Sequence, residues 1–169
     1  MTGRTRALGI AIMACGVLLM ALPALPWYGA SVPTGSAWLT GYGAGGASWI
    51  LPVVGVALVV MGVLVLWWSV PPGTRGARVI GSLTILWAVL GVAWSALVAL
   101  SPRVEVVAER ARLADAVLAG EWAVSVLPAA WACLAAAALA GMAGILLMTP
   151  RTGDGAPDDD EALQPPDAP

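Results

Sequence analysis

Residues 47–68, ASWILPVVGVALVVMGVLVLWW, contain no ionisable side chain. At about 1.5 Å of rise per residue, this stretch reaches roughly 33 Å as a helix, enough to cross a hydrocarbon layer about 30 Å thick. Lipid offers the backbone no hydrogen-bond partners, so an isolated apolar run must satisfy its own N–H and C=O groups, as a helix does. Trp49, Trp67 and Trp68 would then lie at the two headgroup levels. The stretch predicts a membrane-spanning helix.

Three further apolar stretches give the same expectation, and the predicted spans are residues 7–26, 47–68, 79–100 and 123–148. Only 11% of the 169 residues are charged and 60% are hydrophobic, whereas soluble domains carry about 25% charged residues. We therefore predict an all-α integral membrane protein, with a four-transmembrane-helix bundle over residues 1–150.

The connecting segments differ in composition. Residues 29–46 are uncharged and rich in glycine, which predicts an irregular loop along the membrane surface. Residues 103–121 alternate apolar and charged positions at helical spacing, which predicts a short external amphipathic helix between spans 3 and 4. Residues 151–169 are rich in proline and acidic residues, which predicts a disordered acidic cytoplasmic tail.

Aromatic residues gather near the predicted span ends, where amphipathic rings suit the headgroup region. We predict interfacial positions for Trp27, Tyr28, Trp38, Tyr42, Trp49, Trp67, Trp68 and Trp122. The alternative is that the first five of them line a shallow aromatic site for a flat or lipid-like ligand.

Small residues repeat along the third and fourth spans. Such faces let helices approach closely, so we predict that spans 3 and 4 pair through them, and that a partner protein also uses the fourth-span face. The residues are Gly91, Ser95 and Ala99 on the third span, and Ala132, Ala136, Ala140 and Gly144 on the fourth.

Trp87 and Trp94 lie seven residues apart and hence on one face of the third span. A packing role or an interhelical hydrogen bond explains them, because a buried indole N–H needs a partner. The alternative is a cavity between the spans, lined by these two residues together with Ser95 and Trp131.

The chain offers little reactive chemistry. It contains no histidine, so the commonest general base and metal ligand is missing, and Cys15 and Cys133 fall inside predicted spans. The predicted spans hold no carboxylate, and no phosphate-binding glycine loop is present. We therefore predict no catalytic residues, no cofactor, no metal site and no nucleic-acid binding. The absence of an ionisable side chain at membrane depth also argues against a proton-coupled transporter or an ion channel.

Orientation follows from the basic residues, all eight of which are arginine. Arg4, Arg6, Arg75, Arg78 and Arg151 fall on one side of a four-span topology, against Arg103, Arg110 and Arg112 on the other. By the positive-inside rule the first side is cytoplasmic, which places both termini in the cytoplasm. A three-span alternative would put the acidic tail outside, and the continuous apolar run after Trp122 argues against it.

Several short sequences resemble the tryptophan-associated transmembrane family of high-GC Gram-positive bacteria, small proteins of unassigned activity. The resemblance extends over most of residues 5–150. It rests on Pro26-Trp27, Gly46-Ala47-Ser48-Trp49, Arg75 and Arg78 before Val79-Ile80-Gly81, and the charged segment before the last span. The long acidic tail departs from the family pattern. The resemblance implies a four-span membrane protein and no catalytic residues.

Together these features predict a non-enzymatic protein of the bacterial cytoplasmic membrane. Its expected partners are the lipid bilayer and a membrane protein or a second copy of the chain, and its expected role is that of an accessory or assembly subunit. The alternative is a small transporter or export factor for a neutral or aromatic solute.

Overall fold

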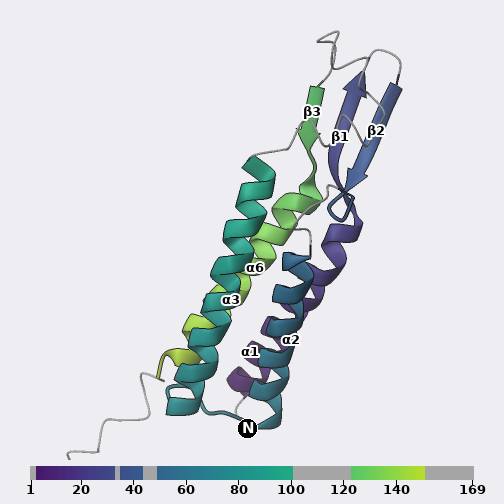
Figure 1. Cartoon of the computed structure of the whole chain (residues 1–169). Helices are drawn as coiled ribbons and strands as arrows, with labels where there is room; N and C mark the ends of the chain where they lie inside the picture. The colour runs from purple at the N-terminus through teal and green to yellow at the C-terminus, as the bar shows by residue number, and fades with distance from the viewer. Residues whose placement is uncertain (1–2, 33–34, 44–48, 101–122, 151–169) are drawn as a thin grey trace, which may run out of the picture.

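A computed structural model describes residues 3–32, 35–43, 49–100 and 123–150 of the chain. In Figure 1 the long helices lie side by side, and the strands stand together beyond one end of them, opposite the N-terminus. In chain order the elements are α1 (Gly3–Ala21), the 3-10 turn η1 (Leu22–Ala24), β1 (Pro26–Val32), β2 (Gly35–Thr40), α2 (Ile50–Trp67), α3 (Arg75–Leu100), β3 (Ala123–Val126) and α6 (Pro128–Met148).

The described part of the chain is mostly helical, and four of its helices are long and apolar enough to cross a membrane. Charged residues enter these helices only in their first turns, and proline does not interrupt them. Pro52 and Pro128 lie in the first turns of α2 and α6, where a missing N–H leaves no helical bond unmade.

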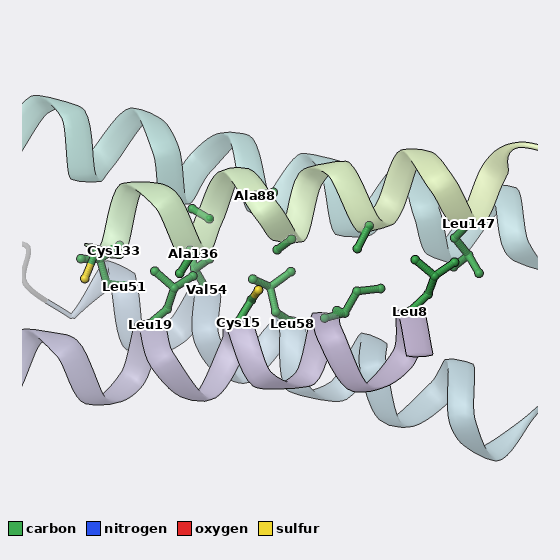
Figure 2. Packing of buried hydrophobic residues seen from close by; sticks show 14 of the residues in the cluster. Leu8, Cys15, Leu19, Leu51, Val54, Leu58, Ala88, Cys133, Ala136 and Leu147 are labelled. Atoms are coloured by element: carbon green, nitrogen blue, oxygen red, sulfur yellow. The ribbon is translucent and has the colours of Figure 1, made fainter. Parts of the chain in front are cut away.

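Each long helix has two main neighbours. α1 packs against α2 and α6, and α3 packs against α6 and α2. Leu19 of α1, Val54 and Leu58 of α2, and Leu147 of α6 are fully buried between them, and Figure 2 shows these side chains directed into the space between the ribbons. An apolar core of dispersion contacts therefore fills the centre of the helical region.

The α1 and α2 backbones approach closely through glycine. A Cβ atom added to Gly16 would lie 2.6 Å from the Gly55 carbonyl oxygen, and one added to Gly62 would lie 2.8 Å from the Gly9 carbonyl oxygen. No side chain fits at those distances. The two antiparallel helices therefore meet at matched glycines seven residues apart on each helix, which is the close packing that lipid environments favour.

α3 and α6 form a second close pair. A Cβ atom on Gly81 would lie 2.8 Å from the Gly144 carbonyl oxygen, and one on Gly91 would lie 3.2 Å from the Ala137 Cβ atom. The helical region is thus built from two close pairs, α1 with α2 and α3 with α6, joined by the contacts of α1 with α6 and of α2 with α3.

A three-stranded antiparallel sheet in the order β2-β1-β3 continues from the helices. Gly29 of β1 pairs with Trp38 on one side and with Ser125 on the other. The Leu127 N–H donates to the Trp27 carbonyl at 2.8 Å and continues the ladder towards α6. The sheet therefore joins the connection between α1 and α2 to the segment before α6.

This sheet corrects the predicted all-α class. Residues 29–46 were expected to form an irregular loop on the membrane surface, yet much of the stretch is a hairpin. The fourth span was expected from residue 123, but residues 123–126 are a strand and the helix begins at Pro128. A fixed proline φ suits the first helical position, and the preceding residue, Leu127, is extended with ψ 159°.

The other span boundaries shift by a few residues. The first helix begins at Gly3 rather than at residue 7, and α3 begins at Arg75 rather than at residue 79. At the start of α3, the Ala77 N–H donates to the Thr74 hydroxyl at 3.3 Å, so Thr74 caps the helix. The predicted external helix at 103–121 and the predicted tail at 151–169 lie outside the described residues.

Candidate functional site

Tyr28 lies where the sheet meets the end of α3. Its side chain is 2% exposed, and its hydroxyl donates to the Val98 carbonyl oxygen at 2.7 Å. Val98 is within the last turn of α3, where backbone carbonyls lack partners inside the helix. Burial disfavours the tyrosinate ion and so raises the pKa of Tyr28. The residue acts as a side-chain cap on α3.

Trp27 is buried just as deeply, at 2% exposed. Its indole N–H donates to the Leu22 carbonyl at 3.0 Å, in the 3-10 turn after α1. A Cβ atom on Gly41 would lie 2.7 Å from the Trp27 ring, so the chain after β2 closes directly over the indole. Trp27 therefore fastens the hairpin to the end of α1.

Tyr42 adds a third contact of this kind from a more exposed position. Its hydroxyl donates to the Met20 carbonyl oxygen at 2.8 Å, in the last turn of α1. Its ring lies 6.5 Å from the Trp49 ring, centroid to centroid. We call Trp27, Tyr28 and Tyr42 the aromatic cap, because all three donate to carbonyls near helix ends.

Trp27 and Tyr28, which were predicted at interfacial positions, have rings that are buried by the protein itself. Pro26 and Trp27 begin β1 rather than a free chain, and the register of its pairing with β2 shifts between Pro26 and Tyr28. Trp122 lies outside the described residues. Of the other tryptophans in this prediction, Trp38 on β2 and Trp49, Trp67 and Trp68 near the ends of α2 present exposed rings.

The five aromatic rings of the alternative ligand site do not come together in the structure. Trp27 and Tyr28 of β1 are buried, whereas Trp38 is 64% exposed on β2. Tyr42 and Trp49 make the one ring–ring contact found among the described residues. The five rings therefore do not line one common surface.

The small-residue faces of α3 and α6 lie mostly inside the protein. Gly91, Ser95 and Ala99 are buried on α3. On α6, Ala136, Ala140 and Gly144 are buried, but Ala132 is exposed. A Cβ atom on Gly144 would lie 3.2 Å from the Thr84 Cβ atom of α3. The buried part of the fourth-span face is used within the chain and is not available to a partner.

The residues proposed to line a cavity between the spans differ in how deeply they are buried. Trp87 and Trp94 are partly buried and pack against the core, whereas Trp131 is 47% exposed. The Ser95 hydroxyl is buried and is the one buried side-chain polar atom without a hydrogen-bond partner in the part of the chain described. Trp131 therefore does not share an interior site with Ser95.

The opposite end of the helical region carries the four arginines of the described residues, Arg4, Arg6, Arg75 and Arg78. Arg4 donates to the Leu146 carbonyl at 3.1 Å and to the Thr149 hydroxyl at 3.2 Å, and so joins the start of α1 to the end of α6. The Gly73 N–H donates to the Leu147 carbonyl at 3.2 Å. Arg4 and Gly73 thus satisfy one carbonyl each at the end of α6. No pattern in the sequence predicts this contact of Arg4.

Reactive groups are sparse in the described residues. Cys15 and Cys133 are free and buried in α1 and α6, and no group of three metal-ligating side chains occurs within the described ranges. Every acidic residue of the chain lies outside those ranges. The described residues therefore offer apolar packing, hydrogen-bonded helix caps and exposed arginines, and few reactive groups.

Four long apolar helices, exposed aliphatic side chains on their outer faces and tryptophans near their ends indicate a multi-pass membrane protein. No protein-family model matches the chain, and no curated protein is significantly similar to it.

Proposed function

We propose that this chain is a non-enzymatic accessory or assembly subunit in the cytoplasmic membrane of a bacterium, with both termini in the cytoplasm. The same proposal places the sheet on the outer side of the membrane. Its relationship to the tryptophan-associated transmembrane family, on the residues quoted above, is part of this proposal.

The filled centre of the helical region supports this proposal most directly. Ile12, Leu19, Val54 and Leu58 are each 0% exposed, and glycine contacts bring the helix backbones together around them. A solute pathway needs an interior that can admit water or substrate, and ion or proton pathways usually carry an ionisable residue at membrane depth. An interior of this kind instead suits a protein that acts through its surface.

The surface available to a partner includes the sheet end of the molecule. Its strands come from the connection between α1 and α2 and from the segment before α6, and buried aromatic side chains hold them to the helix ends. Trp38 projects from β2 with 64% of its surface exposed. Exposed aromatic rings on a well-supported element are common anchors in protein–protein interfaces.

Affinity purification from native membranes tests the proposal. The full chain, tagged and extracted in mild detergent, is expected to retain one membrane-protein partner in a constant molar ratio. A Trp38→Ala variant should lose at least half of that partner, whereas Trp67→Ala at the other end should retain it. Recovery of the chain by itself, or equal retention by both variants, would count against the accessory role.

The proposed orientation is tested separately in intact cells. Reporter tags at the two chain ends should both be protected from an impermeant reagent, because the arginine-rich side is assigned to the cytoplasm. Labelling of one end but not the other would overturn the four-span topology.

Ser95 supports the alternative role in moving a neutral or aromatic solute. A buried hydroxyl without a partner usually costs stability, and a neutral solute bound beside Ser95 could accept a hydrogen bond from it. Under this alternative, Ser95→Ala reduces solute movement in proteoliposomes. Under the accessory role, the same variant leaves partner retention unchanged and does not lower stability.

A further inference from the structure

Four arginines and two tryptophans gather at the end of the helical region opposite the sheet. We call this surface the arginine end; it consists of Arg4, Arg6, Trp67, Trp68, Arg75 and Arg78. The hydrogen bonds of Arg4 to the end of α6, and of Gly73 to the same helix end, show that the starts of α1 and α3 lie together there. Figure 1 shows the N-terminus, the α2–α3 turn and the end of α6 at this end.

Within the described residues, no acidic side chain balances the positive charge of the arginine end. The first acidic residue in the sequence is Glu105, so α1, α2, α3 and their connections contain no carboxylate at all. Arg4 donates to two neutral oxygens, which leaves its charge in place. Arg6, Arg75 and Arg78 are exposed. Four guanidinium groups therefore share one surface without an acidic partner from the described residues.

The same surface lies at the level of lipid headgroups if the helices cross a bilayer. Trp67 is 81% exposed and Trp68 is 65% exposed, at the end of α2 and directly before the turn to Arg75. Indole N–H groups favour the interfacial region, and guanidinium groups bind phosphate oxygens through two parallel hydrogen bonds. The positive ends of the α1 and α3 helix dipoles add to the same field.

We propose that the arginine end selects anionic phospholipids, such as phosphatidylglycerol, over zwitterionic lipids of the same chain length. This inference rests on the proposed membrane location. A zwitterionic headgroup brings its own cation close to the guanidinium groups, whereas an anionic headgroup leaves a net charge for them to neutralise. Basic residues near a membrane surface each strengthen binding to anionic lipid by roughly fivefold.

The test measures which lipids remain bound to the full-length chain. The protein is purified in mild detergent, equilibrated with equimolar dioleoyl phosphatidylglycerol and dioleoyl phosphatidylcholine, and analysed by native mass spectrometry. The expected result is a bound phosphatidylglycerol-to-phosphatidylcholine ratio well above one. Raising NaCl from 50 to 500 mM should lower this ratio, because added salt screens exposed charges.

Matched variants assign the selectivity to this surface. The triple variant Arg6→Gln, Arg75→Gln, Arg78→Gln should lower the ratio about fivefold for each arginine that contacts a headgroup. A control with the same change in charge, Arg103→Gln, Arg110→Gln, Arg112→Gln, alters only the segment between α3 and β3 and should leave the ratio unchanged. Replacement of the first three arginines by lysine should keep the ratio above one, since lysine retains the charge.

The outcomes separate this inference from the membrane proposal. A wild-type ratio of one, or an equal loss in both glutamine variants, would overturn the lipid selectivity while leaving the membrane location intact. A ratio that exceeds one only after deletion of residues 152–169 would show that the acidic tail occupies the arginines instead, which also overturns it. A chain that enters neither micelles nor bilayers would refute the membrane proposal itself.

Discussion

Tyr28 and Tyr42 make the same chemical contact in different surroundings. Each hydroxyl donates to a carbonyl in the last turn of a helix, Tyr28 to Val98 and Tyr42 to Met20. Tyr28 is almost fully buried, whereas Tyr42 is 37% exposed. Water can replace a lost donor only where it can reach the carbonyl, so the two bonds should differ in their effect on stability.

We expect Tyr28→Phe to lower the free energy of unfolding by about 1–2 kcal/mol, because it leaves a buried carbonyl without its donor. The matched change Tyr42→Phe should cost less than about 0.5 kcal/mol, since water satisfies the Met20 carbonyl. Unfolding in mixed detergent, followed by far-UV circular dichroism, measures both values. Equal losses in the two variants would mean that burial does not increase the contribution of the Tyr28 hydrogen bond to the free energy of unfolding.

Titration of Tyr28 gives a second prediction. Burial raises the pKa of Tyr28 above its ordinary value near 10, so the folded state resists ionisation more than the unfolded state does. The stabilising contribution is then fully present below about pH 10 and is lost as the pH rises through the folded pKa. The stability difference between wild type and Tyr28→Phe should therefore shrink above pH 10.

Tyrosinate absorbance provides the direct measurement. The chain contains two tyrosines, so the Tyr42→Phe variant reports Tyr28 alone. Its titration midpoint should lie at higher pH in the folded chain than after denaturation. A coincident midpoint would show that the Tyr28 hydroxyl is open to solvent.

At the scale of elements, glycine decides how α1 and α2 meet. A glycine in a helix interior is normally less stable than alanine by roughly 0.5–1 kcal/mol. At Gly16 that preference should reverse, because an added Cβ atom would lie 2.6 Å from the Gly55 carbonyl oxygen and the neighbour is rigid backbone. The helices would have to move apart along their whole contact.

We expect Gly16→Ala to lower the free energy of unfolding by about 1–3 kcal/mol, the usual range for overpacking. The control is Gly76→Ala in the first turn of α3, where the added Cβ atom would meet only the Val70 side chain at 3.5 Å. That variant should be neutral or slightly stabilising. The detergent unfolding assay applies to both, and a neutral Gly16→Ala would contradict the close approach of α1 and α2.

At the scale of the whole molecule, the sheet joins segments that are far apart in the sequence. Gly29 of β1 pairs with Ser125 of β3, and a Cβ atom on Gly29 would lie 3.1 Å from the Ser125 hydroxyl oxygen. The connection between α1 and α2 is thereby fixed to the start of α6. Movement of α1 relative to α6 would have to break this pairing.

The double variant Gly29→Cys, Ser125→Cys should form a disulfide during growth of the cells. The two positions are direct partners in the β1–β3 ladder, a Cβ atom on Gly29 would lie 3.1 Å from the Ser125 hydroxyl oxygen, and the sheet is proposed to face the oxidising side. Native Cys15 and Cys133 are replaced by alanine in this background. Thiol alkylation with and without reductant measures the bond.

The control pair for this experiment is Gly29→Cys with Thr74→Cys, whose two positions lie at opposite ends of the molecule and should remain reduced. A reduced Gly29–Ser125 pair that also fails to cross-link with an added oxidant would contradict the β1–β3 pairing. Cross-linking with added oxidant only would instead contradict the proposed outward position of the sheet.

Much of the helical architecture follows from the order of residues along the chain. A long apolar run without charges has one way to satisfy its backbone in lipid, so Ala47–Trp68 predicts a helix whatever it later packs against. The same local reasoning predicted the other three helices to within a few residues, apart from the late start of α6. It also located Arg75 and Arg78 near the start of the third helix.

The tertiary structure decided the features that depend on distant partners. β1 and β3 are paired by hydrogen bonds between Gly29 and Ser125, nearly a hundred positions apart, and the short extended run at 123–126 looks like part of a hydrophobic helix until that pairing is seen. The hydrogen bond of the Tyr28 hydroxyl to the Val98 carbonyl likewise joins residues 70 positions apart. Span formation is a local balance of backbone hydrogen bonds and lipid, whereas sheet pairing, burial of the cap and the choice of helix neighbours require the folded chain to bring remote groups into contact.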